Sequence, residues 1–328
     1  MCNVVAQTRK EVSPENGDYI DALIKRNGLD AEEYRAAFIK INKKKLGANN
    51  TLRLDTRYEL PTPEDIGLKN GGQTTERRQQ VVPILGEKYK TVDYVDNALK
   101  GATFYLVSGH GGPDPGAQAI YAGSTLSEDE YAYDVMLRLA RQLIRHRALV
   151  HVIIRDPSDG IRDDEILANS DNETCLGAPI PLNQIDRLRQ RTDSINTLYA
   201  KERKNSNYCR SVFLHLDSRS KDKRIDIFFY HFTKSVKGER LASVLRNKME
   251  EKYRKHQPKR GFSGNVSERN LFVLRETDPV GVFLELGNIQ NPLDLLRFVR
   301  PSNREAMARW IAEGLIEDYK AEKNSTKK

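Results

Sequence analysis

Alternating strand and helix patterns from residue 101 onward restrict the fold more than any other feature. Short apolar runs bounded by turn residues, which are typical of buried strands, alternate with longer segments of helical periodicity. Strands that alternate with helices form a sheet covered on both faces, so we predict an α/β domain with a twisted, mostly parallel (mixed) sheet. The predicted strands are 104–107, 150–154, 212–216, 225–230, 271–274 and 280–285, and the predicted helices are 127–147, 182–204, 238–253 and 302–320.

The first predicted strand ends in a glycine-rich loop that carries His110, within the stretch TFYLVSGHGGPDPGA. In open α/β sheets ligands bind beyond the carboxyl ends of the strands, so a histidine here is well placed for chemistry. Its neighbours Gly109 and Gly111 allow sharp turns and a close approach of the backbone to a ligand. Taken alone, a histidine in a glycine loop is a weak indication of a metal ligand or a catalytic group.

The helix predicted after Ser127, a good N-cap residue, begins with the carboxylates of the run EDE. Such carboxylates commonly compensate the helix dipole. Helical phase nevertheless separates two of them. At about 100° per residue, Glu128 falls within roughly 20° of Val135 and Leu139 on the apolar stripe, whereas Glu130 falls on the opposite, polar face. A carboxylate on the buried stripe needs a partner, so Glu128 is the one that could reach a metal at the strand ends.

Two further candidates stand at the ends of apolar strands. His215 ends one such run, although a lone histidine there is more often a hydrogen-bonded core residue, and His231 in the run FFYHF is a competing candidate. Glu285 ends another apolar run, where a carboxylate is either salt-bridged or catalytic. Because Gly287 and Asn291 follow in a turn-rich loop that can approach a substrate, we favour a catalytic role for Glu285.

Four segments in order, SGHGGPDPGA, VIIRDPSDG, VFLHLDS and NLFVLRETDPVGVFLELGNIQN, resemble the zinc-dependent N-acetylmuramoyl-L-alanine amidase family, type 3 catalytic domain. The resemblance covers residues 101–320 and implies a twisted, mostly parallel sheet flanked by helices. It also implies that Zn²⁺ is the cofactor, with His110, Glu128 and His215 as its ligands, and that Glu285 is the catalytic glutamate.

The chain departs from the family's pattern at several positions. Leu216 and Asp217 follow the second histidine, where the family has a small residue and Asn, and Asn288 replaces an aromatic residue. The insertion after Asp156 is longer than the family leads us to expect. This turn-rich loop at 156–178 is either a lid over the site or an autoinhibitory segment.

The implied chemistry is hydrolysis of the amide bond between N-acetylmuramic acid and L-alanine of the peptidoglycan stem peptide. Two histidines and one glutamate leave a fourth position on zinc for water, whose pKa the metal lowers to about 7. Glu285 would take the water proton and pass it to the leaving nitrogen. Arg275, expected just after a strand, either holds a stem-peptide carboxylate or forms a salt bridge, and Asn291 is a further candidate substrate contact.

Two other functions stay open. One is a non-catalytic cell-wall-binding protein, and the other is a zinc amidase or peptidase that acts on another envelope substrate. Substrate choice would lie in loops such as 156–178.

Ahead of the catalytic domain, residues 18–62 resemble a LysM module, with two helical stripes and a closing Leu60-Pro61 pair. A small helical cap on the main domain is the alternative. We expect a leader remnant or tail at 1–17, a linker at 63–100, the catalytic domain at 101–322 and a basic tail at 323–328.

Composition narrows the range of partners. The net charge of +8 suits an anionic partner such as a wall polymer, while the lack of aromatics between the basic residues argues against nucleic acid. No apolar run approaches the ~20 residues of a membrane span. Three cysteines without a CxxC spacing indicate neither a disulfide framework nor a thiolate zinc site.

The start MCNVVAQ looks like the end of a signal peptide, so we expect export to a bacterial cell envelope or periplasm. The sequence does not fix the oligomeric state.

Overall fold

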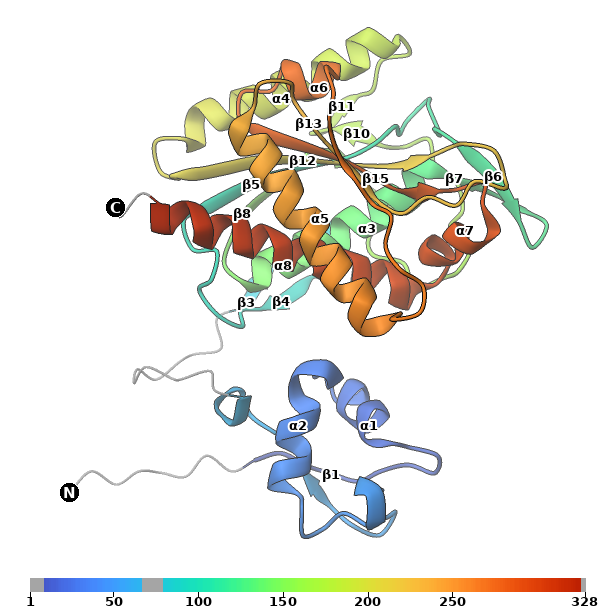
Figure 1. The fold of residues 1–328 in the computed structure, drawn as a ribbon, viewed down its shortest axis with the longest axis vertical. Helices are drawn as coiled ribbons and strands as arrows, with labels where there is room; N and C mark the ends of the chain where they lie inside the picture. Colours follow the sequence, from blue (N-terminus) through green and yellow to red (C-terminus); the bar gives the residue numbers. More distant parts are fainter. Residues whose placement is uncertain (1–8, 67–78, 326–328) are drawn as a thin grey trace. The chain divides into compact units, whose positions relative to one another are not determined.

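The computed structural model describes residues 9–66 and 79–325. The chain divides into two compact units, Met1–Glu76 and Arg77–Lys328, which we describe one at a time (Figure 1). The expected end of a signal peptide, MCNVVAQ, the linker glycines at 71–72 and the final part of the expected basic tail, 326–328, lie outside the described residues. No helix within the described ranges is both long and apolar enough to span a lipid bilayer.

The first unit packs two helices, α1 (Ile20–Arg26) and α2 (Ala31–Ile41), with a short antiparallel pair, β1 (Glu11–Val12) and β2 (Tyr58–Glu59). Asn42 joins helix to strand, because its buried side chain donates to the Glu59 carbonyl at 2.8 Å and accepts from the Glu59 N–H at 2.9 Å. Since β1 belongs to this unit, the tail expected at 1–17 extends too far. The LysM-like character stays a prediction. Two 3-10 turns, Ala48–Asn50 and Pro63–Ile66, complete the unit.

A six-stranded sheet forms the centre of the second unit. Its strands, in spatial order, are β14 (Val266–Glu268), β13 (Phe228–His231), β15 (Val280–Asn288), β12 (Tyr208–Asp217), β5 (Ala102–Ser108) and β8 (Leu149–Val152). β13 runs antiparallel to β15, and the other neighbouring pairs are parallel. This mixed, mostly parallel sheet confirms the predicted fold class.

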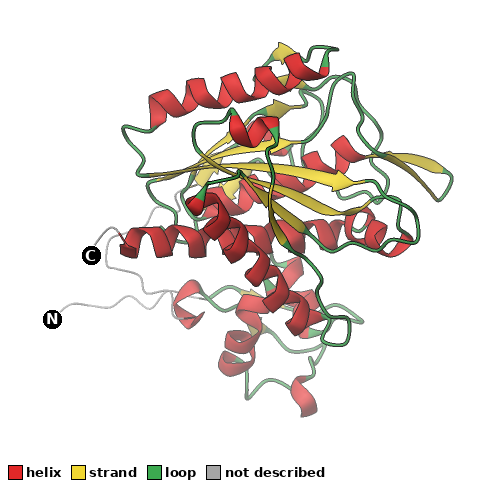
Figure 2. Cartoon of the chain, turned by 45° about the horizontal axis from the view of Figure 1, so that its top comes forward, coloured by secondary structure: helices red, strands yellow, loops and turns green. Residues whose placement is uncertain are grey.

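Helices cover both faces of the sheet (Figures 1 and 2). One face carries α3 (Glu128–Arg145), α5 (Val236–His256) and α8 (Pro301–Ser325). The other face carries α4 (Gln184–Glu202) and the short α6 (Phe272–Arg275). The four predicted long helices are therefore confirmed. Helix α7 (Pro292–Val299) follows β15 directly.

Alternating side chains on the central strands fill both layers. In β5, Phe104 and Leu106 belong to the core with α3, α5 and α8, whereas Tyr105 and Val107 belong to the core with α4 and α6. A strand that is apolar on both faces is what the centre of a covered parallel sheet requires.

Two predicted strands differ from the structure. The segment 271–274 forms helix α6 instead, with the adjacent residues Val273 and Leu274 both buried. Periodicity alone cannot separate a strand from a helix in so short an apolar run. The strand predicted at 150–154 is divided between β8 and β9 (Ile154–Arg155), and β9 pairs with β10 (Thr174–Cys175), which pairs with β11 (Ala178–Pro179).

The segment after residue 79 also differs, because we expected a linker at 63–100. Its described part forms an antiparallel pair, β3 (Gln79–Val81) and β4 (Thr91–Asp93), around a 3-10 turn at Pro83–Leu85. Leu85 is fully buried in the core that contains α3. This segment is therefore an integral part of the second unit.

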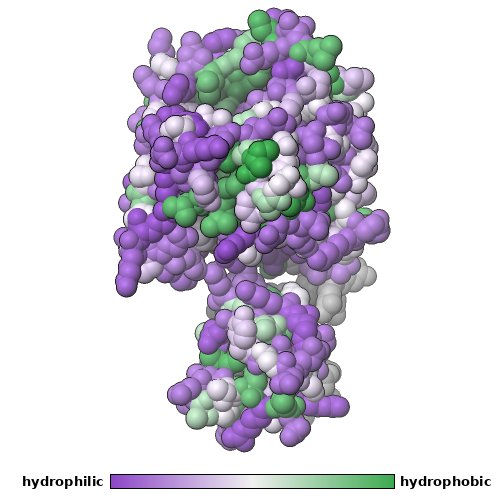
Figure 3. All heavy atoms as spheres, turned by 90° about the vertical axis from the view of Figure 1, so that its right-hand side faces the viewer, coloured by the Kyte–Doolittle hydropathy of each residue, from purple (hydrophilic) through white to green (hydrophobic). Residues whose placement is uncertain are grey.

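Apolar side chains are exposed on the side of the second unit that faces the viewer in Figure 3. The hairpin of β6 (Gln118–Tyr121) and β7 (Ser124–Ser127) and helix α7 lie on this side, and hydrophobic residues gather in the middle of the unit's face (Figure 3). Ile120 in β6 is 72% exposed and Leu293 in α7 is 55% exposed. This side therefore offers apolar as well as polar contacts.

Candidate metal and active site

The three candidate metal ligands lie together where β5, β12 and α3 meet. His110 follows the end of β5, His215 lies near the end of β12, and Glu128 is the first residue of α3. One ligand atom from each residue lies within 4.8 Å of the others. Glu128 joins the two imidazoles, because its Oε1 lies 2.9 Å from His215 Nδ1 and its Oε2 lies 3.3 Å from His110 Nε2.

Glu128 is buried, as its place on the apolar stripe of α3 predicts, and two backbone amides hold it. The Ala117 N–H donates to Oε2 at 2.9 Å, and the Leu216 N–H donates to Oε1 at 3.0 Å. Burial alone would raise the pKa of Glu128, but His110 and His215 outweigh it and hold the pKa well below its usual range. The carboxylate is therefore ionised and able to face a cation.

His110 has a left-handed backbone with φ 56°, which is uncommon for a residue with a side chain. Asp114 Oδ2 lies 3.0 Å from Nδ1, so Nε2 is the nitrogen that faces Glu128. Arg187 in α4 donates to the same Asp114 oxygen at 2.6 Å. Burial would lower the pKa of His110, but Asp114 and Glu128 outweigh it and raise the pKa to about 10. A divalent cation bound here would replace that proton.

Two glycines leave the space that these side chains occupy. A Cβ at Gly116, where φ is +69°, would come within 2.7 Å of the His110 ring and 2.8 Å of Glu128 Oε2. A Cβ at Gly109 would overlap with the His215 imidazole. The backbone thus approaches a group of two imidazoles and one carboxylate, a set of donors that suits zinc.

Glu285 lies on the strand next to this group. In the parallel pairing of β12 with β15 it is directly opposite His215. Its Oε2 is buried and has no hydrogen-bond partner among the described residues. Burial first, and then the charges of Glu128 and Asp217, raise the pKa of Glu285 to about 8. A buried carboxyl oxygen without a partner is costly, which is typical of a functional position.

Three other candidates lie outside this group. Arg275 is at the end of helix α6 rather than after a strand, and it pairs with Glu276 at 2.7 Å. Asn291 is the N-cap of α7, where its side chain accepts hydrogen bonds from two backbone N–H groups of the first turn. His231 lies in β13, with Nδ1 3.1 Å from a backbone carbonyl. The roles of Arg275 and Asn291 as substrate contacts stay predictions.

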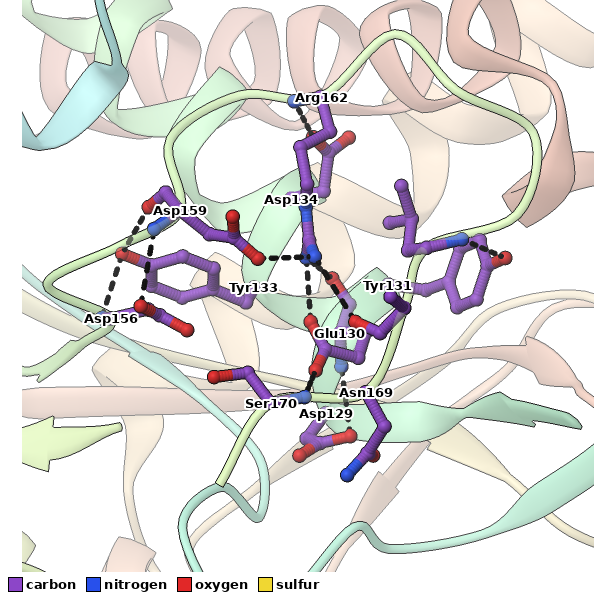
Figure 4. A network of polar contacts seen from close by, with 12 residues as sticks. Asp129, Glu130, Tyr131, Tyr133, Asp134, Asp156, Asp159, Arg162, Asn169 and Ser170 are labelled. Atoms are coloured by element: carbon purple, nitrogen blue, oxygen red, sulfur yellow. Dashed lines mark hydrogen bonds and ion pairs between the residues drawn. The ribbon is translucent and has the colours of Figure 1, made fainter. Parts of the chain in front are cut away.

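A second acidic group includes the two residues that follow Glu128, and the sequence analysis missed it. One oxygen each of Asp129, Glu130 and Glu173 lie within 4.8 Å of one another, and all three residues are buried. Glu130 was expected on the polar face of α3, but it is 1% exposed, because the segment 156–178 covers that face (Figure 4). The only signal in the sequence was the run EDE at the start of the helix.

Contacts at two places hold the segment 156–178 against the rest of the second unit. Arg162 pairs with Glu130 at 2.6 Å, and its backbone N–H donates to Asp134 in α3 at 2.8 Å (Figure 4). Glu173 accepts from the Gly112 N–H at 2.8 Å, which ties the segment to the loop after β5. A role of this segment as a lid or an autoinhibitory element stays a prediction.

A comparison with protein families identifies the chain. The family model described as N-acetylmuramoyl-L-alanine amidase matches residues 105–317. The chain belongs to the N-acetylmuramoyl-L-alanine amidase family. The match to this amidase family includes all three candidate ligands and Glu285. The chain is therefore an enzyme of peptidoglycan hydrolysis, as the resemblance implied.

Individual relatives of this amidase are distant. The germination-specific N-acetylmuramoyl-L-alanine amidase of Bacillus subtilis (strain 168) is 24% identical over 222 residues, which are 66% of this chain and 80% of the relative. Among solved structures, the amidase AmiC2 of Nostoc punctiforme is 18% identical with a TM-score of 0.48, covering 68% of this chain and 99% of the other. The CwlD amidase of Clostridioides difficile, solved in complex with the GerS lipoprotein, is 17% identical with a TM-score of 0.49, covering 67% and 99%.

Proposed function

We propose that this amidase is a zinc hydrolase that cleaves the bond between N-acetylmuramic acid and L-alanine of the stem peptide. His110, Glu128 and His215 would hold the metal, and Glu285 would act as general base and then as general acid. The observation that carries the proposal is the unpartnered Oε2 of Glu285 beside three donors within 4.8 Å of one another.

The donor set fits zinc in a catalytic site, since two imidazoles and one carboxylate leave a coordination position free. When bound, zinc supplies Lewis-acid activation of a water molecule and of the scissile carbonyl. Asp114 would keep the His110 ring oriented through Nδ1, and the amides of Ala117 and Leu216 would keep both oxygens of Glu128 in place.

Glu285 would move the proton. Its Oε2 has no competing hydrogen-bond donor among the described residues, so it can accept a proton from the attacking water. Burial and the neighbouring carboxylates raise the pKa of Glu285 to about 8, so the protonated group can hold the proton until it returns it to the leaving nitrogen. The negative charge of Glu128 helps to raise the pKa of Glu285. A cation bound by Glu128 would offset that charge, lower the pKa of Glu285 and so favour its ionised form, which acts as the base.

The substrate suggests where the enzyme acts. Peptidoglycan lies in the cell envelope, and a relative's name connects it with germination. We therefore infer an exported enzyme that acts in the envelope or periplasm.

Digestion of purified peptidoglycan tests this proposal. We expect the zinc-loaded protein to release free stem peptides that begin with L-alanine, identified by mass spectrometry, and we expect a chelator to abolish the release and zinc to restore it. Glu285→Gln should lower the rate by about 10²–10⁴-fold while the zinc content stays unchanged. Glu276→Gln on the surface is the matched control. Full activity of Glu285→Gln, or release by the metal-free protein, would contradict the mechanism.

A further inference from the structure

Two departures from the family's pattern, Asp217 and Asn288, both contact one residue, Arg219. Asn288 at the end of β15 is fully buried, and its Oδ1 accepts from the backbone N–H of Arg219 at 3.1 Å. Asp217 Oδ2 accepts from Nε of the same arginine at 2.7 Å. Asp217 and Asn288 therefore fix the position of Arg219.

The Arg219 guanidinium lies over the cross-strand neighbour of Glu285. Its central carbon is 5.4 Å from the centre of the Phe228 ring, and Phe228 is the direct cross-strand partner of Glu285 in the antiparallel pair of β13 and β15. The charge of Arg219 also lowers the pKa of Glu285, opposing burial and the neighbouring acids that raise it. The Arg219 guanidinium and the Glu285 carboxyl therefore interact electrostatically.

The guanidinium of Arg219 has N–H groups that are available to bind a ligand. Only Nε is bonded to Asp217, and the two terminal nitrogens have no hydrogen-bond partner in the part of the chain that the structure describes. The side chain is 35% exposed. Terminal guanidinium nitrogens form a planar fork that matches a carboxylate, and a fork already held at Nε loses little freedom when a carboxylate binds.

We propose that Arg219 forms a subsite for a carboxylate of the stem peptide, on the side of the scissile bond that carries L-alanine. This inference rests on the proposed function and names the part of the substrate that the enzyme recognises. In the stem peptide, the residue after L-alanine is D-glutamate joined through its side chain, so its α-carboxylate is free unless it is amidated. Arg275, the candidate from the sequence, differs from Arg219 because one of its terminal nitrogens is also bonded, to Asn270 Oδ1 at 3.1 Å, in addition to the bond from Nε to Glu276.

A pair of soluble substrates tests the subsite. The zinc-loaded enzyme is assayed with N-acetylmuramoyl-L-alanyl-D-glutamate and with its α-carboxamide, which differ only in the charge that Arg219 would bind. We expect the wild-type enzyme to prefer the carboxylate by about tenfold in kcat/KM, mainly through KM. Arg219→Gln should make the two KM values nearly equal, and Arg219→Lys should retain part of the preference. Arg275→Gln, a surface arginine outside the site, should keep the wild-type preference.

The outcomes separate the subsite from the proposed function. Equal kcat/KM values for the two substrates in the wild-type enzyme, or an unchanged preference in Arg219→Gln, would overturn the subsite while the amidase mechanism stands. A loss in Arg219→Gln that affects kcat equally on both substrates would show a role through Glu285 alone and would also overturn it. If the wild-type enzyme released stem peptides from peptidoglycan but cleaved neither soluble substrate, the subsite would be overturned while the proposed function stands, and cleavage of neither peptidoglycan nor the soluble substrates would overturn both.

Discussion

At the scale of single residues, hydrogen bonds to the candidate ligands decide which atoms face the metal position. Asp114 occupies Nδ1 of His110, and backbone amides occupy part of each Glu128 oxygen. Such partners orient a ligand before the metal arrives, so they contribute to affinity without touching the metal.

Asp114→Asn should therefore weaken zinc binding by about 10–100-fold, because a neutral amide does not supply the negative charge that orients the His110 ring and pairs with Arg187. Competition with a chromogenic chelator measures the affinity. Asp96→Asn is the matched control, since Asp96 makes the same kind of bond to His146 at 2.8 Å outside the site. Equal zinc affinity of the two variants would show that Asp114 does not position the ligand.

Glu173 makes stability depend on pH. Burial first, and then Glu130 and Asp156, raise its pKa from 4.5 to about 7. Below pH 4.5 the folded and unfolded states are both protonated; between 4.5 and 7 only the unfolded state ionises, so the folded state loses stability as the pH rises. Glu173→Gln should remove a penalty of up to about 3 kcal/mol at pH 8 and have little effect at pH 4.

Urea unfolding of wild type and Glu173→Gln at both pH values checks this prediction. Glutamine can still accept from the Gly112 N–H, so the contact between segment and loop is kept. Glu276→Gln serves as the exposed control. Parallel stability curves across this pH range would contradict the raised pKa.

Local sequence pattern was enough to predict where several candidate residues lie, while their roles stay predictions. Helical phase is enough to place Glu128 inward, and the end of an apolar strand is enough to bring His215 and Glu285 to one edge of the sheet. Glu130 was misjudged for a different reason, because whether the polar face of a helix is covered depends on what packs against it in three dimensions. The proposed substrate contact of Asn291 stays a prediction.

At the scale of elements, helix α3 contributes both to the candidate metal group and to the packing of the segment 156–178. Its first residue belongs to the candidate metal group, and its second face is covered by the segment 156–178 through Arg162 (Figure 4). No periodicity in α3 could predict that cover, because the covering segment has no regular structure over most of its length. The same limit explains the segment 271–274, whose apolar residues fit either a strand or a helix.

Arg162→Met should leave Glu130 buried without its ion pair and destabilise the fold by about 3 kcal/mol. Hydrogen exchange should accelerate in the segment 156–170 and stay slow in β12. Arg189→Met is the control, because its 3.7 Å pair with Asp186 is exposed and contributes little. If Arg162→Met were as stable as Arg189→Met, the ion pair would not be what holds the segment.

At the scale of the whole molecule, the described residues form separate cores in the two units. Leu23, Ile24 and Phe38 belong to the core of the first unit, whereas β5, β12 and β15 contribute to the cores of the second. Each unit therefore buries its own apolar residues. The alternation of strands and helices predicted the architecture of the second unit, but not the inclusion of β3 and β4, whose short strands carry little pattern.

A chain reduced to residues 77–328 should fold, bind zinc with the same stoichiometry and cleave soluble muropeptides at the rate of the full chain. Thermal unfolding and the muropeptide assay measure this. If the first unit binds glycan, only the activity on intact sacculi should fall. An insoluble or inactive 77–328 fragment would contradict the independence of the second unit.

The parallel pairing of β5, β12 and β15 also has a kinetic consequence. The residues that surround the candidate metal position are far apart in the sequence, and they meet only after these strands have paired. Long-range strand pairing is slow and limits the rate of folding. A cation that binds after this step stabilises the native state without stabilising the transition state, so it lowers the unfolding rate and leaves the folding rate unchanged. Chelation should therefore shorten the lifetime of the folded enzyme without slowing its refolding.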